Sequence, residues 1–156
     1  PLLSALKAKR RALSEQQKVP AYIVFNDKTL IEMAEKRPKS LDEMASVGGV
    51  GAKKLERYGQ AFLSVVTGEE HKIHPTRRKI AGLPEAEVFD QLLISQRILE
   101  RGDSRTEKLL SCSRTTLRNI AKVRPQNLDK LGQIPGMNDA RTERFGKAFI
   151  EILQSL

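Results

Sequence analysis

The chain of 156 residues carries 28 lysines and arginines against 19 aspartates and glutamates, which gives a formal net charge of +9. One cysteine excludes a disulfide framework and favours a reducing compartment. No apolar run approaches the ~20 residues that span a bilayer, so we expect no membrane partner. The positive charge favours a polyanion, most simply nucleic acid. The first residue is not Met, so we expect a fragment of a longer protein.

The beginning of the chain carries two helical patterns. The apolar residues of the first pattern lie on one side of a helix: Leu2, Leu6 and Leu13. Asn26 or Asp27 can cap a second helix, which must end before Pro38 because proline disfavours the helical conformation of the residue before it. Tyr22–Phe25 is a short β-prone run between them. No segment shows sustained strand-like alternation.

Two further helices follow in the same half of the chain. Residues Ser40 to Glu43 fit a capping box that opens a short third helix. The fourth helix has apolar residues spaced by three, four and three: Leu55, Tyr58, Phe62 and Val65. The sequence therefore predicts an all-α fold.

An internal repeat organises the chain. Residues 29–66 align without a gap with residues 116–153 at a constant offset of 87, and 13 of these 38 columns are identical. Glycine, proline and apolar columns all coincide, which predicts two copies of one fold. We expect two tandem helical bundles, at residues 1–67 and 84–156, joined by a basic linker at residues 68–83.

The linker has its own charge pattern. Lys72, Arg77, Arg78 and Lys79 occur between residues 71 and 84 without any acidic residue. These side chains can add affinity for a nucleic-acid backbone. Flexible basic linkers are also commonly just solvated, and the sequence leaves both interpretations open.

The chain lacks the motifs of common catalytic sites. No G-x-x-x-x-G-K-[ST] phosphate loop is present. His71 and His74 invite a metal hypothesis, but with the single Cys112 they leave a four-ligand zinc set incomplete. We therefore expect no catalytic site, no metal and no cofactor.

A glycine-rich turn followed by cations is the first candidate site. Gly49 and Gly51 allow a tight turn and a close approach of the backbone to a phosphate. The amides of the next helix attract anions, and this helix carries Lys53, Lys54 and Arg57. The alternative is an ordinary interhelical turn with a solvated basic face.

Tyr22 is the second candidate. It follows a basic cluster of Lys7, Lys9, Arg10, Arg11 and Lys18, of which all but Lys9 are predicted DNA contacts. An exposed aromatic ring among cations can stack on a base of single-stranded nucleic acid. The alternative is that Tyr22 belongs to the core with Phe25.

The stretch from Val19 to Ala34, with the later Val47–Gly51 turn and the Tyr58–Phe62 run, closely resembles the HRDC domain of RecQ-family DNA helicases and ribonuclease D. It is most similar to that of bacterial RecQ helicases. The resemblance implies about five short helices in each of two tandem domains. It also implies an accessory DNA-binding role beside an ATP-driven 3′-to-5′ motor, and a single-stranded-DNA contact for Tyr22.

The second unit departs from this pattern. Tyr22 aligns with Leu109, Gly51 with Asn138, Lys53 with Ala140 and Asp27 with Arg114. We interpret it as a degenerate copy with the same fold and a different surface, which binds either DNA backbone or a protein.

The expected function is therefore single-stranded or branched DNA binding and substrate selection by a bacterial RecQ-type helicase in DNA repair, recombination or replication. The resemblance implies a cytoplasmic, nucleoid-associated protein, and we expect a monomer. The alternative is a protein-interaction module that docks on the helicase core or on a repair partner. A ribonuclease D-like origin would instead predict a preference for RNA.

Overall fold

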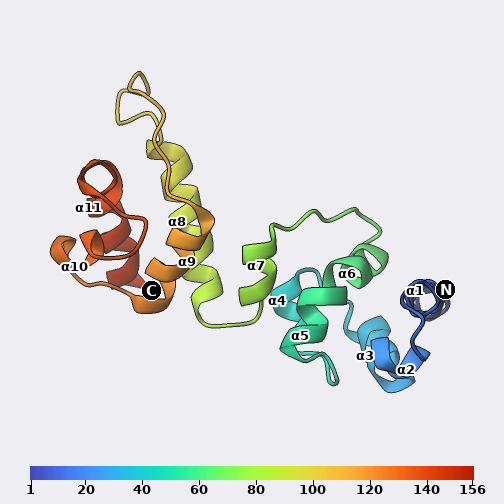
Figure 1. Cartoon of the computed structure of the whole chain (residues 1–156). Helices are drawn as coiled ribbons and strands as arrows, with labels where there is room; N and C mark the ends of the chain where they lie inside the picture. The colour runs from blue at the N-terminus through green and yellow to red at the C-terminus, as the bar shows by residue number, and fades with distance from the viewer. The chain divides into compact units, whose positions relative to one another are not determined.

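A computed structural model describes all residues 1–156 as helices and connecting loops, without a strand. The predicted all-α fold is confirmed. The chain divides into two compact units, Pro1–Leu83 and Pro84–Leu156, each with its own helices (Figure 1). No helix combines the length and the apolar character needed to cross a bilayer.

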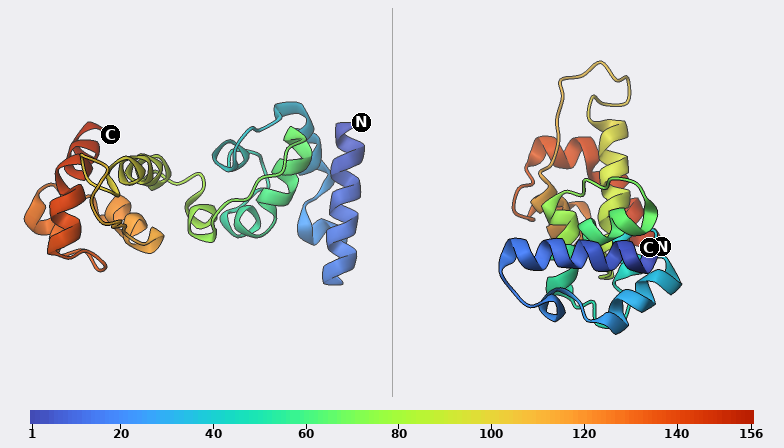
Figure 2. Two further views of the ribbon diagram at one scale, coloured as in Figure 1. Left: turned by 90° about the horizontal axis from the view of Figure 1, so that it is seen from above. Right: turned by 90° about the vertical axis from the view of Figure 1, so that its right-hand side faces the viewer.

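The first unit is built from short helices around one core. Its elements are α1 (Leu2–Gln17), α2 (Ala21–Val24), α3 (Asp27–Lys36), α4 (Leu41–Met44), α5 (Ala52–Lys54), the π-helical turn η1 (Leu55–Gly59), α6 (Gln60–Thr67) and α7 (Pro75–Ile80). The β-prone run proves to be the single helical turn α2. Helix α1 lies along α6 (Figure 2).

The predicted helix starts are confirmed by their caps. The side chain of Asn26 accepts a hydrogen bond from the Thr29 amide at 2.8 Å, at the start of α3. The hydroxyl of Ser40 accepts one from the Glu43 amide at 3.1 Å, at the start of α4. Such caps satisfy amides that have no partner within the helix, so these short helices begin at defined residues.

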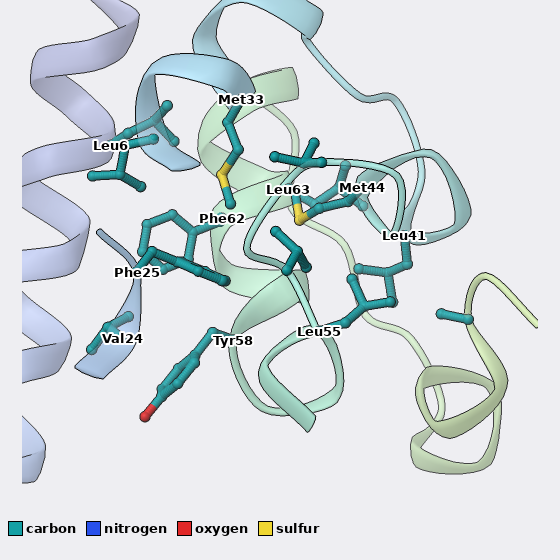
Figure 3. Close-up of a cluster of buried hydrophobic side chains, with 14 residues drawn as sticks. Leu6, Val24, Phe25, Met33, Leu41, Met44, Leu55, Tyr58, Phe62 and Leu63 are labelled. Atoms are coloured by element: carbon teal, nitrogen blue, oxygen red, sulfur yellow. The ribbon is translucent and has the colours of Figure 1, made fainter. Parts of the chain in front are cut away.

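Three aromatic rings form the centre of the first core (Figure 3). Phe25 packs edge-on against Phe62, with ring centroids 5.0 Å apart, and against Tyr58 at 6.1 Å. Leu6 of α1 and Met33 of α3 are fully buried in the same cluster. The Tyr58 hydroxyl donates to Gln17 at 2.6 Å, so the polar end of this buried ring is satisfied.

Residues 68–83, expected as a linker, lie within the first unit and contain a helix that the sequence analysis did not predict. Arg77 of α7 pairs with Asp42 at 2.5 Å, and the Gly82 amide donates to the same carboxylate at 2.8 Å. Ala81 is buried in the first core. These contacts dock α7, so the segment is an ordered part of the first unit.

The second unit repeats the order of the main helices, but a loop replaces α2 and one continuous helix replaces α5, η1 and α6. Its helices are α8 (Glu85–Leu99), α9 (Arg114–Val123), α10 (Leu128–Gly132) and α11 (Asp139–Ser155). Where the first unit has α2, the second has a loop that continues beyond the end of α8 (Figure 1). Arg144 holds this loop by donating to the carbonyls of Glu100 and Lys108, both at 2.8 Å.

A threonine packs against a glycine turn in both units. Gly49 has φ +85°, and a Cβ at this residue would lie 2.2 Å from the Thr29 hydroxyl oxygen. Gly136 has φ +95°, and a Cβ at this residue would lie 2.0 Å from the Thr116 hydroxyl oxygen. Thr29 also donates to the Gly48 carbonyl at 2.8 Å. Glycine is therefore required at both positions by backbone conformation and by space.

Gly49→Ala should destabilise the chain, whereas Gly51→Ala should not. Gly51 has φ −79°, and no atom lies within 4 Å of the place that an alanine methyl group would take, so alanine fits there without strain. We expect a loss of about 1–3 kcal/mol for Gly49→Ala and a change within about 0.5 kcal/mol for Gly51→Ala. Urea unfolding followed by circular dichroism measures both. Equal stabilities would contradict the assignment of Gly49 as the sterically required glycine.

Candidate nucleic-acid interface

Tyr22 lies on the surface of the first unit. Its residue is 65% exposed on α2, while Phe25 and Tyr58 supply aromatic rings of the core. The alternative that Tyr22 is a core residue is therefore wrong. An exposed tyrosine leaves a π-face accessible to a planar ligand, and the exposed Ile23 lies beside it in the chain.

Two predicted cations lie over the rings next to this segment. The ammonium of Lys54 lies 6.0 Å from the ring centroid of Phe25, and Phe25 follows Tyr22 by three residues. The guanidinium of Arg57 lies 5.3 Å from the centroid of Tyr58. Both aromatic faces hold the cations by cation–π attraction and leave their N–H groups free to contact an anion.

A groove of about 870 Å³ brings further cations together on the first unit. It is lined by Lys9 from α1, Lys53 from α5, Arg57 from η1 and Arg78 from α7, together with Glu56 and Glu70. Lys9 belongs to the basic cluster before Tyr22 but was not among the predicted contact residues. Four cations against two carboxylates give the groove a net positive charge suited to an anionic ligand.

Arg10, which the sequence predicts as a DNA contact, has structural partners within the first unit. Its guanidinium pairs with Asp27 at 2.7 Å and donates to the Phe25 carbonyl at 3.0 Å, and its side chain is only 14% exposed. The hydrogen bond and charge of Arg10 hold the pKa of the Asp27 carboxyl below its usual value. Arg10 thus joins α1 to the start of α3.

The other predicted cations of α1 are accessible to solvent. Lys7 is exposed on the helix, and the exposed Lys18 caps its end in the left-handed conformation, at φ 56°. Arg11 is exposed and pairs with Glu15 at 3.1 Å. Surface pairs of this kind contribute little to stability, so Arg11 can exchange its partner for a phosphate at small cost.

The four basic residues of the expected linker have different surroundings in the structure. Arg77 contacts Asp42 through both guanidinium nitrogens, at 3.2 and 2.5 Å, and is therefore structural. Arg78 donates to the Ile73 carbonyl at 2.8 Å and lines the groove. Lys72 and Lys79 are exposed. Docking of α7 places Arg78 in the same groove as Lys53 of α5 and Arg57 of η1. Spacing along the chain could not indicate this proximity.

In the second unit, the equivalent cations donate hydrogen bonds to backbone carbonyls of the same unit. Arg144, the counterpart of Arg57, holds the loop described above, and Arg141, the counterpart of Lys54, donates to the carbonyls of Ser111 and Gly136. Leu109, at the position of Tyr22, is exposed but has no aromatic ring. These contacts leave the second unit without an equivalent of the first unit's basic and aromatic surface.

The residues considered for a metal or a nucleophile have structural contacts. His71 lies 2.9 Å from the Thr67 hydroxyl, and His74 caps α7 by accepting from the Thr76 amide at 3.1 Å. No group of three or more potential metal-binding side chains occurs. Burial raises the pKa of Cys112 to about 11, although nearby Arg141 opposes the shift. A thiol with that pKa is protonated near neutrality and is a poor nucleophile.

Two helical bundles with a basic, partly aromatic surface on the first define a class of small accessory nucleic-acid modules. The chain belongs to the HRDC domain family, whose model matches residues 1–66 and 110–153. The second segment covers the repeat and the end of the preceding loop, so the family includes both units.

Similar proteins are DNA helicases of more than one kind. The chain is 45% identical over 71 residues to the ATP-dependent DNA helicase RecQ of Haemophilus influenzae, over 46% of the chain and 11% of that protein. It is 45% identical over 67 residues to the helicase UvrD2 of Mycobacterium bovis, over 43% of the chain and 10% of that protein. A RecQ helicase of Bacillus subtilis is 40% identical over 65 residues, 42% of the chain and 11% of that protein.

The chain thus spans about a tenth of the length of these relatives. The matched region of the chain is the HRDC region. No solved structure gives a significant match.

Arg10→Ala and Arg11→Ala should separate stability from binding. Loss of Arg10 leaves the Phe25 carbonyl without its hydrogen bond, so we expect about 1 kcal/mol lower stability. Arg11 is exposed, so Arg11→Ala should leave stability within about 0.5 kcal/mol and weaken binding to an oligonucleotide. Urea unfolding and fluorescence anisotropy measure the two effects. An unfolding curve of Arg10→Ala that overlays the wild type would contradict the structural role.

The docking of α7 should depend on pH. Burial alone would raise the pKa of Asp42, but hydrogen bonds from Arg77 and the Gly82 amide outweigh it, so the pKa lies below the ordinary 3.8. A carboxyl whose pKa is lower when folded stabilises the fold above its unfolded pKa and loses that stabilisation as the pH falls. The Gly82 amide should therefore exchange faster as the pH drops from about 5 to about 3, after correction for the intrinsic rate. Asp42→Asn should show a smaller change over that range, and an equal change would rule out this carboxylate as the cause.

Proposed function

We propose that the chain is an accessory DNA-binding region of a RecQ-type DNA helicase. In this proposal the first unit binds single-stranded segments of the substrate and so contributes to substrate selection in DNA repair or recombination. The motor that hydrolyses ATP belongs to another part of the same protein. The HRDC membership and the similarity to helicases support an accessory nucleic-acid-binding role in general.

The exposed ring of Tyr22 is the observation that carries the single-strand part of the proposal. A base of single-stranded DNA can stack on a free aromatic face, which is worth about 1–3 kcal/mol. A base in a duplex is already stacked on its neighbours and gains less. Since Phe25 and Tyr58 fill the core, Tyr22 can serve a ligand without any cost in packing.

The groove supplies the second part of the interaction. A strand stacked on Tyr22 can place neighbouring phosphates near Lys54 and Arg57, and further along near Lys9, Lys53 and Arg78. Such contacts are non-specific for sequence and sensitive to salt. The proposal therefore describes a weak, general binder that increases the local concentration of substrate beside a motor.

A protein-interaction module is the second candidate function. The observation that favours it is a set of exposed apolar side chains on the second unit, including Ile94 and Ile98. Exposed apolar groups that lie together indicate a binding surface. The two functions can coexist because they use different units.

Tyr22→Ala should weaken binding of a short thymidine oligonucleotide to the full chain by about 1 kcal/mol or more, through the loss of stacking. Tyr22→Phe is the matched control, since it keeps the ring and should retain nearly all of the affinity. Fluorescence anisotropy measures binding, and circular dichroism checks that both variants keep their helices. If Tyr22→Ala binds as tightly as Tyr22→Phe, the single-strand proposal fails.

Binding should also weaken with added salt. If about three phosphates are contacted, the slope of log K against log salt should be near −2 for single strands. Lys53→Ala should reduce the slope by about 0.7, one phosphate contact, whereas Lys36→Ala, at an exposed position of α3, should leave it unchanged. Titration at several salt concentrations gives these slopes. An affinity independent of salt would exclude the nucleic-acid function.

A further inference from the structure

We propose that the exposed side of α8, centred on Ile94 and Ile98, binds an acidic amphipathic peptide segment of a protein partner. This inference concerns the second unit and is independent of DNA binding by the first.

The two isoleucines form one apolar surface. Ile94 is 50% exposed and Ile98 is 58% exposed, and side chains four residues apart lie next to each other on a helix. The helix buries other residues in the second core, among them Phe89 and Leu92. The isoleucines therefore do not pack the unit and remain available to a ligand.

Comparison of the units shows how this surface differs. At the constant offset of 87, Ile94 aligns with Lys7 and Ile98 with Arg11. Both cations are exposed on α1, the equivalent helix of the first unit. The same face of the same helix is therefore basic in one unit and apolar in the other. The two isoleucines of the second unit offer an apolar ligand a surface to bury, whereas a phosphate finds neither of the two cations there.

A further difference between the units leaves an arginine of α8 without a carboxylate partner. Arg97 aligns with Arg10, which is held in the first unit by Asp27. The position of Asp27 is occupied by Arg114 in the second unit, so the carboxylate partner is absent. Arg97 is accordingly exposed and makes no ion pair. A guanidinium beside Ile98 is thus free to bind a carboxylate from outside.

Two more arginines lie close to Ile98 and Arg97. A hollow of about 310 Å³ is lined by Ile98 and by Arg97, Arg101 and Arg105, with Glu100 as its single acidic residue. Arg101 and Arg105 are exposed and unpaired. Three cations next to an apolar strip are complementary in charge and polarity to a segment that alternates acidic and apolar side chains.

A peptide fits this surface better than a nucleic acid does. The three aromatic rings of the second unit, Phe89, Phe145 and Phe149, are all buried, so no ring is available to stack on a base. The isoleucines can contribute to affinity only by being removed from water, which an apolar side chain of a peptide achieves.

The test uses the full chain and a fluorescein-labelled peptide of about 15 residues, in which leucines recur at helical spacing and glutamates fill the other positions. Fluorescence anisotropy should show saturable binding, and the amide signals of Ile94 and Ile98 should shift in NMR spectra. The double variant Ile94→Ser and Ile98→Ser should bind about tenfold more weakly. Arg97→Gln should also weaken binding.

Two controls make the result specific. Val123→Ser, which alters another exposed apolar residue of the second unit, should bind as the wild type does. A peptide with lysine in place of glutamate should not bind. The proposal is overturned if the acidic peptide fails to bind, if the lysine peptide binds equally, or if Val123→Ser loses as much affinity as the double variant. It is also overturned if a thymidine oligonucleotide shifts the amides of Ile94 and Ile98 while the peptide does not.

Discussion

The contact between a threonine of the second long helix and a glycine of the following turn fixes the geometry of each unit. The hydroxyl of Thr29 lies where a side chain at position 49 would be, and it donates to the Gly48 carbonyl. The turn can therefore approach α3 closely only because Gly49 has no Cβ and adopts positive φ. This approach determines where α5 begins, and hence where Lys53 and Lys54 emerge. Thr116 and Gly136 repeat the contact in the second unit.

The repeated core carries two different surfaces because surface positions are free of this constraint. The core positions that align, such as Phe62 and Phe149, remain aromatic and buried. Exposed positions change in chemical class, as Tyr22 to Leu109 and Arg11 to Ile98 illustrate. Packing restricts shape at nearly every core position, whereas an exposed substitution rarely alters stability by more than about 0.5 kcal/mol. A duplicated domain can thus acquire a second ligand without losing its fold.

The structure also separates the cations by what they contact, which charge alone does not reveal. Arg10 and Arg77 are largely buried and join helices through carboxylates of the same unit. Arginine suits this role because its planar fork makes several hydrogen bonds at once. Lysines such as Lys7 and Lys53 stay exposed, since their hydrated point charge gains less from burial. Most of the chain's net charge nevertheless faces solvent and remains available to a polyanion.

The sequence by itself determined the all-α class, the two copies and the helix starts at Asn26 and Ser40, because periodicity, capping and an ungapped repeat are local signals. It also singled out Tyr22, but local signals could not show whether the ring is in the core or in solvent. Only the tertiary structure decided that, by filling the core with Phe25 and Tyr58. It likewise decided that α7 docks through Arg77 and Asp42, which lie 35 residues apart. Such pairings depend on how helices pack in space, and a pattern read along the chain contains no record of the side chains that meet from distant positions.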